Sequence, residues 1–211
     1  MYKNYLLYQI ANALVKTYPW IHVSCDSIFH PEQYDKILKN LPKIDSMVDI
    51  RTVKFHPIGY PAERLILTEA QYDSFWTEIQ SQFLDGDLKQ VLLHKFKDYL
   101  IARLGDHIKT VEFYDTFQLT LDTPGYALGP HTDAFDKIFT LVINLVSTNN
   151  CSNMGTTIYA GLNKQIVYQS TYAPNTGFGI FRSEASWHGV EPVTSDRWTI
   201  QYTIWGRDKS H

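Results

Sequence analysis

Two histidines and an aspartate have the residue types and the spacing of a metal site. His131 and Asp133 form an H-x-D triplet shortly after a Pro-Gly turn, and His188 follows 57 residues later. Two imidazoles and one carboxylate make the facial triad that binds Fe(II) and leaves coordination positions open. Any one of these residues alone is better interpreted as an ordinary turn or strand-end residue, so the hypothesis rests on the set.

Arg197 lies nine residues after His188 and begins the segment RWTIQYTIWG, whose other residues are uncharged. A guanidinium in a buried strand needs an anionic partner, because its charge is costly to desolvate alone. Two interpretations remain open. Arg197 forms a structural salt bridge, or it binds one carboxylate of a dicarboxylate ligand bidentately.

The elements that must position these side chains are short strands. From about residue 107 the chain alternates or carries β-branched and aromatic runs, separated by turns rich in Gly, Pro, Asn and Ser. The runs are 111–121, 139–146, 156–159, 165–169, 178–181 and 198–205. Seven or eight short strands at this spacing favour a sandwich or a barrel-like jelly roll. Because helices do not alternate with the strands, a Rossmann-type sheet is disfavoured.

The first half of the chain predicts helices. Apolar periodicity and end signals indicate helices over 1–17, 31–40, 69–83 and 87–104, with an extended, irregular stretch over 50–67. We expect one domain over 1–211, of mainly β class with flanking helices (α+β). In it, 1–106 form a mostly helical support that frames the substrate, and 107–211 form the jelly-roll catalytic core.

Composition excludes several classes of protein. The chain has 211 residues, of which 44% are hydrophobic, and a formal net charge of −3. This apolar content excludes a disordered chain, and the missing basic excess argues against bulk nucleic-acid binding. Two cysteines cannot form a disulfide framework. No uninterrupted apolar stretch reaches the roughly 18 residues that span a bilayer, so we expect a cytoplasmic protein without a membrane partner.

The ordered pattern of H-x-D, a distant His and an Arg nine residues later resembles the Fe(II)- and 2-oxoglutarate-dependent dioxygenases, in particular their prolyl 4-hydroxylase-like branch. The resemblance covers about residues 112–206. It is carried by PGYALGPHTD (124–133), TLVINL (140–145), GTTIY (155–159), GFGIFRSEASWHGVEPV (177–193) and RWTIQY (197–202). YPWIHVSCDSIF and FWTEIQSQF also look like the helical preamble of small bacterial members.

The resemblance implies a double-stranded β-helix of eight core strands. It implies that His131, Asp133 and His188 bind Fe(II), and that Arg197 pairs with the distal carboxylate of the cosubstrate 2-oxoglutarate while O2 takes the remaining position. Asn144 matches a place where this branch often carries a cosubstrate Tyr. Further expected cosubstrate contacts are Thr199 and Gln201, which share a strand face with Arg197, and Thr120 or Gln118, which stand where some relatives have another Tyr.

The expected reaction is hydroxylation of an unactivated C–H bond with decarboxylation of 2-oxoglutarate to succinate and CO2. Asp133 supports this outcome, because relatives that chlorinate lack this carboxylate. Desaturation or ring formation on the same cofactors is an alternative, as is a non-catalytic, cupin-like metal-binding module. We expect a small-molecule or peptidyl substrate and a monomer or homodimer. Substrate contacts are expected in 50–66 and in 147–154. Within 50–66, Arg51, Lys54 and Arg64 are candidates for contact with an anionic or peptidyl substrate, although a solvated surface is the preferred interpretation of these charges.

Overall fold

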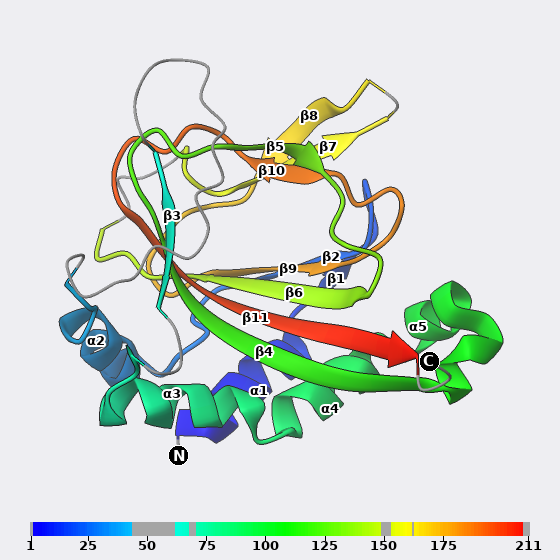
Figure 1. Ribbon diagram of the computed structural model, residues 1–211, viewed down its shortest axis with the longest axis horizontal. Helices are drawn as coiled ribbons and strands as arrows, with labels where there is room; N and C mark the ends of the chain where they lie inside the picture. The colour runs from blue at the N-terminus through cyan, green and yellow to red at the C-terminus, as the bar shows by residue number, and fades with distance from the viewer. Residues whose placement is uncertain (1, 44–61, 68–70, 149–152, 162, 209–211) are drawn as a thin grey trace.

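The second half of the chain forms two facing antiparallel sheets. The computed structural model describes residues 2–43, 62–67, 71–148, 153–161 and 163–208. Strands β4, β6, β9 and β11 lie in a seven-stranded sheet, and β5, β7, β8 and β10 lie in a four-stranded sheet. Their bounds are β4 (Val111–Asp122), β5 (Leu128–His131), β6 (Lys137–Asn144), β7 (Thr156–Ala160), β8 (Gln165–Gln169), β9 (Gly177–Phe181), β10 (His188–Val190) and β11 (Arg197–Asp208). Figure 1 shows the sheets facing each other, which confirms the predicted mainly β, jelly-roll core with flanking helices.

The first half also contributes strands to the larger sheet. Its order is β1-β2-β9-β6-β11-β4-β3, with β1 (Val15–Lys16), β2 (His22–Cys25) and β3 (Arg64–Leu67) added to the core strands. The helix predicted over 1–17 therefore ends early, because Val15 pairs with Val23 in a β-ladder. The division into a support over 1–106 and a core over 107–211 stays a prediction.

The described part of the first half also forms helices. They are α1 (Tyr2–Asn12), α2 (Pro31–Lys39), α3 (Ser74–Leu84), α4 (Asp87–Lys95) and α5 (Lys97–Leu104), and the 3₁₀ turn η3 (Gly105–Lys109) precedes β4. Pro31 begins α2, where its missing N–H costs no hydrogen bond. Asp73 caps α3 by accepting from the backbone N–H of Trp76 at 2.9 Å. Among the described residues, no helix is long and apolar enough to cross a membrane.

The single helix predicted over 87–104 is two helices, with a break at Phe96. The apolar residues of this segment recur every four positions, a spacing that drifts by about 40° per step around a straight helix. A break lets both halves face the sheet. The Phe96 ring is 1% exposed and lies 5.1 Å from the ring of Phe139 and 5.4 Å from that of Phe181.

The two faces of the larger sheet differ in chemistry. Its outer face packs aliphatic and aromatic side chains, such as Leu119, Ile200 and Tyr202, against buried residues of the helices, such as Leu92. Helices α1, α3 and α4 cover this face (Figure 1). The period of two along a strand turns the intervening residues of β4 and β11 toward the smaller sheet. Within 197–203 of β11 and 116–122 of β4 those residues are polar, so the space between the sheets can hold a polar site.

Candidate metal and cosubstrate site

The structure brings the three predicted metal ligands together. His131 ends β5 and His188 begins β10, and the two residues are direct partners in the antiparallel ladder. Direct partners project to the same face of a sheet, and the two imidazole centroids lie 4.4 Å apart. Asp133 follows in the turn toward β6. One ligand atom from each of the three residues lies within 4.8 Å of the others.

Backbone carbonyls orient both imidazoles toward a common point. Nδ1 of His131 lies 3.0 Å from the carbonyl oxygen of Gly129, and Nδ1 of His188 lies 2.8 Å from that of Ser186. A carbonyl oxygen only accepts hydrogen bonds, so each Nδ1 carries a proton, and in the neutral ring Nε2 then has the free lone pair. In this tautomer Nε2 can bind a metal ion while the Nδ1 hydrogen bond fixes the orientation of the ring.

Asp133 is held by two donors. Lys137 Nζ donates to one carboxylate oxygen at 2.7 Å, and Thr140 Oγ1 donates to the other at 3.1 Å. Each oxygen of a carboxylate has two lone pairs, so both retain one for a metal ion. Lys137 and Thr140 are not singled out by the sequence analysis. The sequence feature that could have indicated Lys137 is that it is the one charged residue of β6, whose other residues are uncharged.

The protonation states also suit a cation. Burial lowers the pKa of His188 to about 4, and the neighbouring His131 acts in the same direction. Burial by itself would raise the pKa of Asp133, but Lys137 and His188 outweigh it and leave that pKa below its ordinary value. At neutral pH His188 is neutral and Asp133 is an anion, which are the forms that ligate metals.

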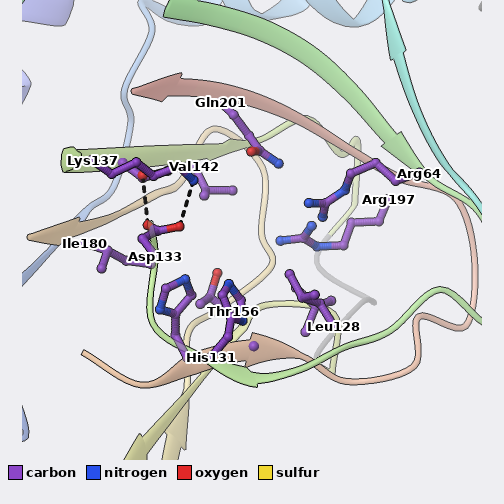
Figure 2. Close-up of a pocket in the computed structure, with 14 residues that line it drawn as sticks. Arg64, Leu128, His131, Asp133, Lys137, Val142, Thr156, Ile180, Arg197 and Gln201 are labelled. Atoms are coloured by element: carbon purple, nitrogen blue, oxygen red, sulfur yellow. Dashed lines mark hydrogen bonds and ion pairs between the residues drawn. The ribbon is translucent and has the colours of Figure 1, made fainter. Parts of the chain in front are cut away.

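The triad lies on one wall of a cavity of about 90 Å³ between the sheets. Arg197 and Arg64 line the same cavity from the larger sheet. Figure 2 shows their guanidinium groups directed into it, opposite His131 and Asp133. The apolar lining of the cavity includes Leu128, Val142 and Ile180.

Arg197 has an anionic partner within the protein. It is 1% exposed, and it donates from Nη1 to Asp122 Oδ2 at 2.7 Å and from Nε to the carbonyl oxygen of Met154 at 2.6 Å. Asp122 also accepts from Arg64, from Nε at 2.6 Å and from Nη2 at 2.9 Å. Both open interpretations of Arg197 therefore find a basis, because it forms a salt bridge and still lines the cavity.

Arg64, a candidate substrate contact of the segment 50–66, lines the pocket, but its pairing with Asp122 does not follow from the sequence. Its side chain is 15% exposed, and its guanidinium carbon lies 4.6 Å from the centre of the Tyr126 ring. The sequence feature that could have indicated this pairing is a pair of short strand-like runs, RLIL (64–67) and QLTLD (118–122), which carry opposite charges at their ends. Of the segments expected to contact the substrate, residues 50–61 and 149–152 lie outside the described residues.

The other predicted cosubstrate residues divide into two groups. Gln201 lines the cavity with Arg197. Asn144, Thr120 and Thr199 lie on the same inner face but are absent from the described lining. The Asn144 amide donates to the Thr171 carbonyl oxygen at 3.0 Å and to Thr176 Oγ1 at 2.9 Å. Thr120 and Thr199 are 0% exposed, and their hydroxyl oxygens have no hydrogen-bond partner among the described residues.

The sequence matches no family model and no curated protein. Solved structures do resemble the chain. A prolyl-4-hydroxylase from Pseudomonas putida has a TM-score of 0.61 at 12% identity, over 97% of this chain and 99% of that chain. A prolyl 4-hydroxylase from Phytophthora capsici has a TM-score of 0.65 at 15% identity, over 97% of this chain and 65% of that chain. A prolyl hydroxylase from Trichoplax adhaerens has a TM-score of 0.55 at 12% identity, over 99% and 90%. The chain therefore has the fold that its motifs imply.

Proposed function

We propose that this chain is an Fe(II)- and 2-oxoglutarate-dependent oxygenase that hydroxylates an unactivated C–H bond. The observation that carries the proposal is a single cavity with a His-Asp-His triad on one wall and two guanidinium groups on the other. A 2-oxo dicarboxylate offers a chelating end to the first wall and an anionic end to the second. The prolyl 4-hydroxylase-like fold agrees with this reading.

His131 and His188 would hold iron through Nε2 and Asp133 through its carboxylate. The bound metal, with 2-oxoglutarate and O2, supplies the oxidising power for hydroxylation, and 2-oxoglutarate leaves as succinate and CO2. The protein contributes orientation: Lys137 and Thr140 fix the Asp133 carboxylate, and Arg197 fixes the far end of the cosubstrate. The apolar lining limits access of water to the reacting groups.

The proposed substrate is a small molecule or a peptidyl group. The prolyl hydroxylase from Trichoplax adhaerens was solved in complex with a hypoxia inducible factor oxygen degradation domain peptide fragment. This supports a peptidyl group as the first class to test for this chain. Hydroxylation, rather than chlorination, is proposed because the triad includes the carboxylate of Asp133. Desaturation or ring formation on the same cofactors is the alternative, and the pose of the substrate decides between these outcomes. A monomer or homodimer in the cytoplasm is proposed as the working form.

The test separates binding from turnover. Under anaerobic conditions, Fe(II) and 2-oxoglutarate together should give a weak visible charge-transfer band, and admission of O2 should give succinate. His131→Ala should remove both signals, because one of the three ligands is lost. His94→Ala, which changes an exposed histidine of α4, serves as the matched control and should retain both. A wild-type protein that binds Fe(II) but gives neither band nor succinate would overturn the proposal.

A metal-binding module without catalysis is the second candidate. The observation in its favour is that Asp122 already provides Arg197 with an anionic partner at 2.7 Å. Such a module would bind Fe(II) or Mn(II) through the triad without affinity for 2-oxoglutarate. Calorimetry of the Mn(II)-loaded protein with 2-oxoglutarate distinguishes the two candidates, because the oxygenase releases binding heat and the module does not.

A further inference from the structure

Arg64, Asp122 and Arg197 form one row across three neighbouring strands. In the ladders, Asp122 of β4 is the direct partner of Arg64 on β3 and of Arg197 on β11. Direct partners across antiparallel strands project to the same face, so the three side chains stand next to one another on the inner face of the sheet. Three of the hydrogen bonds in the row end on the Asp122 carboxylate.

Counted over the described residues, the row carries an uncompensated positive charge. Two guanidinium groups face one carboxylate, and Asp122 is 0% exposed and Arg197 1% exposed. One arginine would be enough to neutralise Asp122. A second cation next to the first, on a wall with little water, costs free energy unless another anion comes to it. The pKa of Asp122 agrees with this charge balance: burial alone would raise it, but Arg64 and then Arg197 keep it below its ordinary value.

The donors of the row are only partly used. A guanidinium has five N–H groups. Arg64 uses two on Asp122, and Arg197 uses one on Asp122 and one on the Met154 carbonyl oxygen. Three N–H groups on each arginine thus have no acceptor within the described residues. Both arginines line the cavity, and Figure 2 shows their nitrogen-bearing ends directed into it.

Other polar residues of the inner face are less suited to a second carboxylate contact. The Asn144 amide, which stands at the position of the cosubstrate Tyr of related enzymes, donates to Thr171 and Thr176. Gln201 lines the cavity but is uncharged. Among the described lining residues, the cations are Arg64, Arg197 and Lys137, and Lys137 is paired with Asp133 at 2.7 Å.

We propose that Arg64 is a second binding residue for the distal carboxylate of 2-oxoglutarate, which lies between the guanidinium groups of Arg64 and Arg197. This inference rests on the proposed function. It assigns to a short strand of the first half of the chain a direct contact with the cosubstrate. Asp122 is hydrogen-bonded to both arginines but neutralises only one of their two positive charges. The distal carboxylate of the ligand neutralises the other.

The test compares two ligands that differ at one end. 2-Oxoglutarate and 2-oxopentanoate share the same chelating group and chain length, but 2-oxopentanoate has a methyl group in place of the distal carboxylate. Their binding is measured by calorimetry on the Mn(II)-loaded protein without O2, so the readout does not depend on turnover. Arg64→Met should weaken 2-oxoglutarate about 10- to 100-fold, as expected for lost charge-assisted hydrogen bonds. The affinity for 2-oxopentanoate should stay within about threefold.

Two further variants complete the test. Arg64→Lys, which keeps the charge, should recover part of the 2-oxoglutarate affinity, whereas Arg207→Met removes an exposed arginine at the far end of β11 and should change nothing. Mn(II) affinity and the thermal midpoint report whether Arg64→Met is folded. If wild type binds 2-oxoglutarate and Arg64→Met binds it equally well, or loses both ligands equally, this inference is overturned and the proposed function stands. If wild type does not bind 2-oxoglutarate, both are overturned.

Discussion

Asp122→Asn removes the only carboxylate of the row while preserving its shape, and we predict a large loss of stability. The carboxylate accepts three charge-assisted hydrogen bonds at 2.6–2.9 Å. Each is worth about 1.5–3 kcal/mol, and the asparagine keeps one neutral acceptor oxygen. Breaking a buried ion pair by removing one partner costs about 3–5 kcal/mol, which is the loss we expect here. For a chain of this size the thermal midpoint should fall by roughly 6–20 °C.

Repulsion between the two arginines leads to a second prediction, which concerns the stability of a double variant. Both guanidinium groups donate to the same oxygen of Asp122, Arg64 at 2.9 Å and Arg197 at 2.7 Å, so their donor nitrogens lie close together. At an effective dielectric constant of about 20, two unit charges about 5.6 Å apart repel by about 3 kcal/mol. Arg64→Met in the Asp122→Asn background should therefore recover about 1–2 kcal/mol, although it removes a further side chain from the row.

The assay is urea unfolding at pH 7, with Asp106→Asn as the control because the Asp106–Lys109 pair is exposed. The pH dependence has a defined sign. The pKa of Asp122 in the folded protein lies below the ordinary aspartate value of about 3.8, so its contribution to stability is present above that value and is lost as the pH falls through the folded pKa. The difference between wild type and Asp122→Asn should be constant from pH 7 to 5 and shrink below about 4. A loss under about 1 kcal/mol at pH 7, or a double variant less stable than the single one, would refute the reasoning.

Three further predictions concern single residues. Gly189→Ala would place its Cβ 2.4 Å from the Leu128 carbonyl oxygen, pushing β10 from β5 and lowering Mn(II) affinity at least about tenfold, whereas Gly129→Ala meets nothing within 4 Å and should bind normally. Leu92→Ala in the core should cost about 2–5 kcal/mol in urea unfolding, and a loss below about 1 kcal/mol would contradict the packing described. Burial raises the pKa of the Cys25 thiol to about 11, which lowers the fraction of reactive thiolate at pH 8. In a Cys151→Ser background, iodoacetamide at pH 8 should therefore modify the native protein on the order of 100-fold more slowly than the urea-unfolded chain. Equal rates would be inconsistent with a buried thiol.

Much of the strand content follows from local pattern. The runs over 111–121 and 165–169 agree with β4 and β8 because both are regular and end at turn residues. The strands β5 and β10 have four and three residues, too few for a period of two to stand out. They nevertheless carry His131 and His188. Sequence places these residues near strand ends, but only the ladder register shows that they face each other.

Arg64 could not be placed from sequence because its neighbours come from far along the chain. Its charge lies 58 residues from Asp122, and Arg197 lies 75 residues beyond Asp122. A short stretch of sequence therefore does not indicate that these three residues are neighbours in the sheet. The break at Phe96 was not predicted for a different reason. Apolar residues four positions apart fit one face of a helix over a single turn, and they leave that face only after their angular drift has accumulated over several turns.

The position of β11 has a consequence for synthesis on the ribosome. β11 is the final strand in the described chain, yet it lies inside the larger sheet, between β6 and β4. Until residues 197–208 have emerged, the sheet consists of two separate ribbons, each with a long unpaired edge that invites aggregation. Because Arg197 begins β11, the row of Arg64, Asp122 and Arg197 is completed in the same step. A ribosome that stops before residue 197 would release an incomplete sheet and a client for chaperones, not a smaller folded protein.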